Sequence, residues 1–173
     1  MNSPKKLEVS LAISAIALTV AMIGAATAQT PAPSAAPAAA APAGPTPAER
    51  AIEYRQAVYK IVAGNFGPLS QAAQGKADFK PEVAAKQAVR LAQIATFVGD
   101  AFPDISKEGK TRALPAIWTN AKDFDPLVQN FVTHTKALAD VTENSSSAGE
   151  EIKSAVTAVA NDCKACHDKF RAK

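Results

Sequence analysis

The sequence predicts an all-α protein built as a four-helix bundle. Four segments between residues 46 and 173 repeat apolar residues every three or four positions, which is the period of an amphipathic helix. No segment shows the sustained alternation of apolar and polar residues that is typical of a strand. A cysteine and histidine motif on the last segment further indicates that the helices enclose a cofactor.

The first two helices have clear starts. A threonine N-cap, an N1 proline and an acid three residues after the cap form a capping box over Thr46 to Glu49. We expect a kink at Gly67-Pro68 and an end near Gly75. The second helix is predicted from Pro81 to about Val98, and its expected inner face is formed by Val83, Gln87, Leu91, Ile94 and Val98.

The last two helices follow a connector from Pro103 to Phe124. The third helix is predicted to start at Asp125-Pro126, as an N-cap followed by an N1 proline. Its expected inner face is formed by Leu127, Phe131, His134, Leu138 and Val141. A second capping box, Ser147 to Glu150, predicts the start of the fourth helix. Its apolar positions run in phase with the cysteine and histidine motif near its end.

The motif is C-x-x-C-H, at Cys163, Cys166 and His167, and its spacing is that of a c-type haem attachment site. Two cysteines three positions apart share one face of a helix, so both thiols can add to the two vinyl groups at one porphyrin edge. The histidine then lies beside the iron as its proximal ligand. The motif therefore predicts one haem c, attached covalently through two thioethers.

Three other interpretations of the motif compete with haem attachment. A dithiol redox pair normally opens a helix after a strand, whereas this motif closes a helix. A zinc site needs four ligands, and residues 49–173 contain only two cysteines and two histidines, His134 and His167, with Cys166 and His167 adjacent in sequence. A chance occurrence of the spacing is the third interpretation. Haem attachment is favoured because the chain is exported and has no other cysteine.

The N-terminus predicts export. Lys5 and Lys6 precede the apolar run Leu11–Ile23, and Ala26-Thr27-Ala28 fits a cleavage site, so residues 1–28 are interpreted as a signal peptide and the protein as periplasmic. Retention of residues 9–28 as an uncleaved membrane anchor is the alternative. Residues 29–45, rich in alanine and proline, are expected to form a disordered linker, and residues 46–173 to form one domain. With 19 basic and 16 acidic residues, the chain shows no sign of nucleic-acid binding.

The far side of the iron should lack a strong protein ligand. The only methionines, Met1 and Met22, both lie in the predicted signal peptide. The remaining candidate is His134, which is either a partly buried residue bonded to a neighbour or a second axial ligand. We therefore expect a five-coordinate iron with an open face.

Residues 49–173 resemble the cytochromes c-prime. The resemblance rests on Tyr54-Arg55-Gln56, on Phe66-Gly67, on the segment from Pro115 to Trp118, and on the motif and the Asp-x-Phe-Arg that follows it, up to Arg171. It implies an antiparallel up-down-up-down bundle, of which this family is itself a standard example.

The resemblance also implies individual roles. It makes Cys163 and Cys166 the thioether anchors and His167 the axial ligand, and it brings Arg55 and Gln56 to the haem propionates. It sets Tyr59 over the open iron face and Arg171 beside the proximal histidine, and Thr111 and Arg112 are weaker candidates for the pocket wall. The residues alone leave other interpretations open: a surface-snorkelling arginine for Arg55, a core aromatic for Tyr59 and a solvated C-terminal arginine for Arg171.

Two functions of different classes follow. The first is a haem protein that binds small gases such as nitric oxide and carbon monoxide, and the second is an electron carrier in a periplasmic redox chain. Enzyme activity is not expected, because no distal histidine–arginine pair of the peroxidase kind is present. The resemblance implies a homodimer through the first two helices, and contact with a membrane is expected only if the N-terminal segment is retained.

Overall fold

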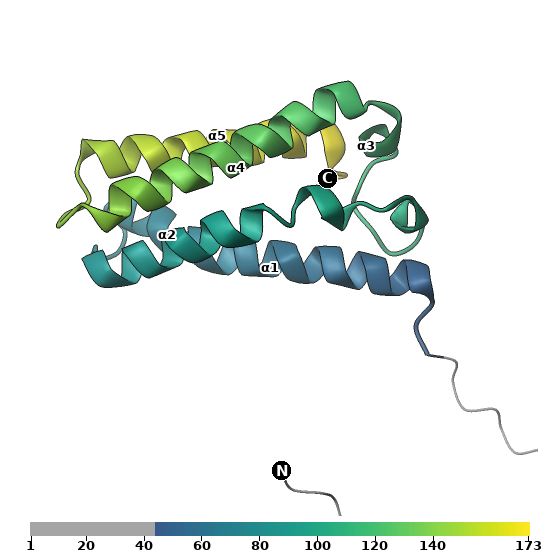
Figure 1. Ribbon diagram of the computed structural model, residues 1–173, viewed down its shortest axis with the longest axis horizontal. Helices are drawn as coiled ribbons and strands as arrows, with labels where there is room; N and C mark the ends of the chain where they lie inside the picture. Colours follow the sequence, from purple (N-terminus) through teal and green to yellow (C-terminus); the bar gives the residue numbers. More distant parts are fainter. Residues whose placement is uncertain (1–43) are drawn as a thin grey trace, which may run out of the picture. The chain divides into compact units, whose positions relative to one another are not determined.

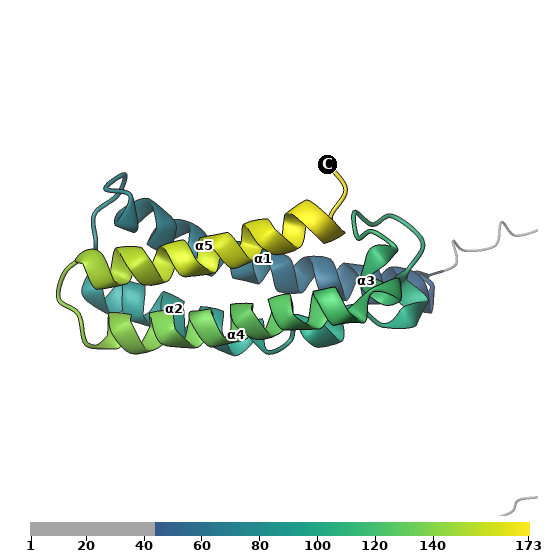
Figure 2. The same ribbon diagram turned by 90° about the horizontal axis from the view of Figure 1, so that it is seen from above.

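Four long helices dominate residues 44–173, the part of the chain that the structure, a computed structural model, describes. They are α1 (Pro47–Ala73), α2 (Pro81–Ala95), α4 (Ala121–Glu143) and α5 (Glu150–Phe170). The connection from α2 to α4 holds η1 (Gly99–Ala101), η2 (Asp104–Ser106) and the short α3 (Ala116–Thr119). Consecutive long helices run in opposite directions (Figures 1 and 2). The predicted all-α, up-down-up-down four-helix bundle is confirmed.

The first helix begins where the sequence predicts it. The Glu49 amide donates to Thr46 Oγ1 at 3.2 Å, and the Thr46 amide donates to the Glu49 carboxylate at 2.8 Å, so both halves of the capping box form. The helix continues through Pro68 and ends at Ala73, close to the expected end near Gly75, which has a φ of 69°. This left-handed conformation is one that glycine adopts without strain.

The inner face of α2 agrees with the prediction only in part, because Leu91 and Val98 are buried as expected whereas Val83 is not. Val83 is 48% exposed, and the buried residues of this helix are Ala84, Ala88, Leu91 and Ala95. Helix α2 packs against both α1 and α4, and alanines let a helix approach two neighbours closely. The close approach of the neighbouring helices explains why small alanines face the core, and a hydrophobicity pattern carries no information about that distance.

The predicted start of the third long helix is wrong. Helix α4 begins at Ala121, and Pro126 lies inside it rather than at N1. The added turn carries Phe124, whose ring packs edge-on against Phe102 at 5.1 Å and against Phe170 at 5.3 Å. The stabilisation from burying the Phe124 ring offsets the loss of the one backbone hydrogen bond that Pro126 cannot donate.

The predicted capping box of the last helix is also wrong. Helix α5 starts at Glu150 with Gly149 as its N-cap, and no side chain caps it. The Ser147 carbonyl accepts from the Gly149 amide at 2.9 Å, which places a turn where the capping box was expected.

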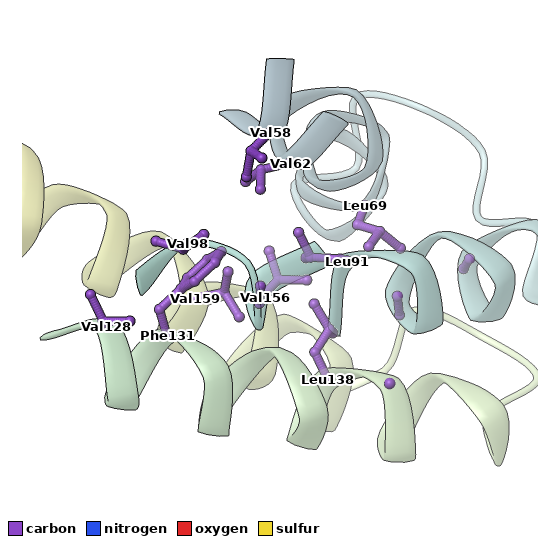
Figure 3. Close-up of a cluster of buried hydrophobic side chains, with 14 of the residues drawn as sticks. Val58, Val62, Leu69, Leu91, Val98, Val128, Phe131, Leu138, Val156 and Val159 are labelled. Atoms are coloured by element: carbon purple, nitrogen blue, oxygen red, sulfur yellow. The ribbon is translucent and has the colours of Figure 1, made fainter. Parts of the chain in front are cut away.

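The core is continuous along the bundle (Figure 3). Side chains of all four long helices converge in it, including Leu69, Leu91, Leu138 and Val159, which are at most 2% exposed. Each such side chain contributes about 1.5–3 kcal/mol through its removal from water. Helix α1 packs far more sparsely on α5 than α4 does, which leaves space between α1 and the end of α5.

Nothing in residues 44–173 forms a helix that is both long and apolar enough to span a bilayer. The predicted signal peptide, the alternative anchor at residues 9–28 and most of the predicted linker lie outside the described residues.

Candidate cofactor site

A cavity of about 700 Å³ lies between α1, α4 and the C-terminal half of α5. Its size is within the range of cofactor-binding pockets, and much of its wall is apolar, with Val62, Phe66 and Phe131 among its residues. All the residues that the sequence singles out for a haem site line this one cavity: Arg55, Gln56, Tyr59, Cys163, Cys166, His167 and Arg171.

The two cysteines are free thiols on one face of α5. Burial raises the pKa of Cys163 to about 11, with a smaller effect from the charge of Asp162, and burial also raises the pKa of Cys166. Dithiol redox pairs and zinc sites use thiolates, which low pKa values favour. Within residues 44–173 no group of three or more potential ligands could hold a metal ion directly. These observations disfavour the dithiol redox and zinc interpretations of the motif.

His167 follows Cys166 and is partly buried. Its Nδ1 lies 3.3 Å from Nη1 of Arg171, one turn further along the chain. Burial lowers the pKa of His167, and the positive charges of Arg171 and Arg112 lower it further. The imidazole is therefore held in its neutral form, which is the form that binds a metal. With Nδ1 facing the guanidinium, Nε2 is the ring nitrogen left for an iron atom.

Arg55 is buried inside the bundle, only 4% exposed, which excludes the surface-snorkelling interpretation. Its guanidinium donates to the Ala101 carbonyl at 3.2 Å, to Oγ and the carbonyl of Ser106 at 2.6 and 3.2 Å, and to Thr111 Oγ1 at 2.8 Å. The Cζ atom of Arg55 also lies 4.9 Å from the centre of the Phe102 ring. All these partners are neutral, and burial lowers the pKa of Arg55. A buried cation without a counter-charge in a cavity wall fits a cofactor that brings carboxylates.

Tyr59 stands one turn after Arg55 and also lines the cavity. Its ring packs edge-on against Phe102 with 6.3 Å between centres. Burial raises the pKa of its hydroxyl well above the usual range, so the group stays protonated at neutral pH. A protonated hydroxyl is a poor ligand for iron but can act as a steric and polar screen.

His134 is turned away from this cavity. It does not line the cavity wall, and its Nδ1 lies 2.7 Å from a carboxylate oxygen of Asp162, which is 8% exposed. This arrangement supports the interpretation of His134 as a residue bonded to a neighbour. Asp162 was not among the residues predicted for the site, although its place directly before Cys163 on the inner face of α5 could have indicated it.

The C-terminal tail is tied to the loop that precedes α3. Arg112 donates from Nε and Nη2 to the Ala172 carbonyl at 3.1 and 2.7 Å, and the Ala172 amide donates to the Arg112 carbonyl at 2.8 Å. The Leu114 amide donates to the Phe170 carbonyl at 2.9 Å. Because Thr111 in the same loop accepts from Arg55, this segment joins α1 to the end of α5 beside His167. Arg171 is therefore anchored through its backbone rather than frayed into solvent.

The family model described as Cytochrome C' matches residues 50–171. The cytochrome c' of Rubrivivax gelatinosus is 36% identical over 126 residues, which cover 71% of this chain and 95% of that protein. The structure of cytochrome c prime from Shewanella frigidimarina superposes with a TM-score of 0.69 at 32% identity and covers 73% and 97% of the two chains.

A nitric oxide complex and a carbon monoxide complex of variants of the Alcaligenes xylosoxidans protein superpose with TM-scores of 0.66 and 0.65 at 26% identity. Each covers 73% of this chain and 97% of that one. The haem-type motif, the cavity around it and these matches lead to one conclusion: the chain belongs to the cytochrome c-prime family, and its cofactor is haem c.

Proposed function

We propose that this protein is an exported gas-binding cytochrome in which His167 is the only side chain on the iron. The observation that carries the proposal is the lack of a second ligand. No methionine occurs in residues 44–173, and His134, which does not line the cavity, is hydrogen-bonded to Asp162. The hydroxyl of Tyr59 stays protonated because burial raises its pKa. Methionine, histidine and tyrosinate, the usual protein ligands for the second axial position, are therefore not expected to bind the iron.

Haem c supplies an iron that can bind a diatomic molecule or change oxidation state by one electron. The chain's own residues then have separate tasks. Cys163 and Cys166 hold the porphyrin edge, and Arg55 with Gln56 binds the propionates. Tyr59 screens the open face, so that small gases enter more readily than larger ligands. The solved nitric oxide and carbon monoxide complexes of related proteins support this assignment.

Arg171 has a distinct task in this proposal. Ligating histidines usually donate their second ring N–H to a carboxylate or carbonyl, which strengthens the ligand. Here a guanidinium, which can only donate, faces Nδ1 of His167. We infer that Arg171 weakens the bond between His167 and the iron.

The test is the absorption spectrum of the ferric and the reduced protein, each recorded with and without carbon monoxide and nitric oxide. We expect high-spin spectra in the absence of gas and a clear change when gas is added to the reduced protein. If the reduced protein shows a low-spin spectrum that neither gas alters, a second protein ligand is present and the proposal fails.

His134→Ala is expected to leave the ferric spectrum unaltered, because the ring is bonded to Asp162 rather than to iron. Ferric spectra of the variant and the parent, recorded at the same pH, check this. A shift from low-spin to high-spin bands on substitution would restore the bis-histidine alternative.

Electron transfer in the periplasm is the second candidate function. Exposed residues at the edge of the cavity favour it, because a redox partner could approach the haem there.

We also propose a homodimer through α1 and α2. Tyr54 and Ile61 lie seven positions apart on α1, are 46% and 49% exposed, and form an apolar outer face with no partner among the described residues. Sedimentation velocity on the haem-loaded protein tests this state, and a monomer at micromolar concentration would refute it.

A further inference from the structure

Among residues 44–173, five that line the haem cavity are also exposed to solvent, and we call these five residues its mouth. They are Gln56, Lys60, Ala63, Arg112 and Arg171. Three of the five are cations and none is acidic. The chain as a whole has 19 basic and 16 acidic residues, so this concentration of one sign is local to the mouth.

The positive charges of the mouth are not neutralised by neighbouring carboxylates. Arg112 bonds to a backbone carbonyl, Arg171 faces His167, and Lys60 makes no ion pair within residues 44–173. Within the described part of the chain, Asp162 is the only acid in the cavity wall, and it is buried and paired with His134. Asp168, the acid next to His167 in sequence, pairs with Lys164.

The haem propionates do not account for all of this charge. Haem c carries two carboxylates, and buried Arg55, which lines the cavity, is the proposed partner of one of them. At most one mouth cation is then taken up by the second propionate. The remaining cations face solvent around the opening through which the haem edge is reached.

We propose that this cationic mouth is the docking surface for an acidic redox protein. The partner gives up one electron as the ferric iron becomes ferrous, or accepts one in the reverse direction, and no bond forms or breaks. Clustered charge around an opening of low dielectric constant raises association rates by about 10–10³-fold and makes them depend on salt. The inference rests on the proposed placement of haem c in this cavity but not on gas binding.

The first experiment oxidises the reduced, haem-loaded protein with two small reagents of opposite charge, ferricyanide and hexaammineruthenium(III). The Debye length falls from about 30 Å at 0.01 M salt to about 3 Å at 1 M. We expect the ferricyanide rate to fall about tenfold over that range and the hexaammineruthenium rate to rise. Equal salt responses for the two reagents would overturn the proposal.

The variant Lys60→Glu sharpens this experiment, because Lys60 is exposed and has no ion-pair partner that its loss would strand. At low salt it should slow ferricyanide about threefold or more and speed hexaammineruthenium. Lys86→Glu, an equal change of charge at an exposed lysine outside the cavity lining, is the matched control and should alter neither rate. Equal effects of the two substitutions would show that only net charge matters and would refute a docking mouth. Lys60→Gln, with half the change of charge, should fall between the parent and Lys60→Glu.

The second experiment uses poly-L-glutamate as a protein-like acidic probe. Calorimetric titration of the haem-loaded protein at low salt should detect binding that Lys60→Glu weakens about tenfold and Lys86→Glu does not. Absence of binding, or binding that both variants weaken equally, would overturn the docking surface. Carbon monoxide is uncharged, so its binding rate in the parent protein should not respond to salt. Failure to bind carbon monoxide would contradict the proposed gas-binding function alone.

Discussion

The two ends of the bundle solve different packing problems. At one end, which we call the closed half, Leu69, Leu91, Leu138 and Ile152 fill the interior and are at most 2% exposed. At the other end, the haem half, a cavity of about 700 Å³ separates α1 from the end of α5. Its wall holds a buried arginine, a protonated tyrosine and two thiols.

The difference shows how one bundle can carry both stability and a site. Apolar side chains in the closed half need no specific partner and are stabilised by removal from water alone. Polar groups in the haem half need partners, and the α2–α4 connection supplies them through Ala101, Ser106 and Thr111. An edge-to-face series of rings, Phe102, Phe124 and Phe170, closes the wall behind them. These hydrogen bonds and ring contacts hold the cavity of the haem half open, so the site is preorganised for its cofactor.

The largest expected effect comes from removing both thiols. Cys163→Ser with Cys166→Ser should abolish covalent haem attachment, because a hydroxyl does not form the thioether. The closed half should remain helical, since neither residue lies in it. Haem retention after denaturing extraction and far-ultraviolet circular dichroism check the two parts. Loss of helicity throughout the chain would show that the two halves fold only together with haem.

A substitution in the closed half should have the opposite profile. Leu138→Ala, at a side chain with no exposure, should lower the free energy of unfolding by about 2–5 kcal/mol. Carbon monoxide binding rates should not change, because Leu138 does not line the cavity. Denaturant unfolding and stopped-flow spectroscopy measure these quantities. Val83→Ala, at a residue that is 48% exposed, is the matched control and should cost less than about 0.5 kcal/mol. Altered gas kinetics in Leu138→Ala would mean that the halves are coupled.

Arg55→Met should affect both stability and redox behaviour. The loss of its donors leaves buried oxygens of Ala101 and Ser106 unsatisfied, which should cost about 1–3 kcal/mol. If Arg55 lies beside the haem as proposed, loss of its positive charge favours the ferric state, so the midpoint potential should fall by about 60 mV, equivalent to a tenfold shift for one electron. Unfolding curves and a redox titration check the two effects. A lower free energy of unfolding with an unchanged midpoint potential would show that Arg55 has a structural role only.

The smallest of these effects is kinetic and concerns Tyr59. Tyr59→Ala should speed carbon monoxide binding about tenfold, or about 1.4 kcal/mol in barrier height, because it removes the side chain that we propose as a screen over the iron. Tyr59→Phe keeps the ring and should retain a rate close to that of the parent. Tyr54→Ala, at the other tyrosine, which is 46% exposed, is the control and should change nothing. Stopped-flow mixing of the reduced protein with carbon monoxide gives the rates. Unchanged rates in Tyr59→Ala would show that this ring does not guard the iron.

Much of the fold could be predicted from local signals. The capping box at Thr46 and the end of the last helix near its haem motif depend on residues close together in sequence. Two details were predicted wrongly, the burial of Val83 on α2 and the start of α4, and the reason is not local. Ala84 and Phe124 are buried because of helices or rings that lie elsewhere in the chain. Period and capping rules carry no information about such neighbours.

The sequence by itself determined the chemistry of this protein: a C-x-x-C-H motif, a domain without methionine, and four helices to enclose a haem. Those properties depend on which residues are present and on their spacing along one helix. Only the tertiary structure decided that His134 bonds to Asp162, that Arg55 is buried without a counter-charge, and that Lys60 joins two arginines at one mouth. These relations link residues more than twenty positions apart, and the packing of the helices, rather than any local pattern, brings them together.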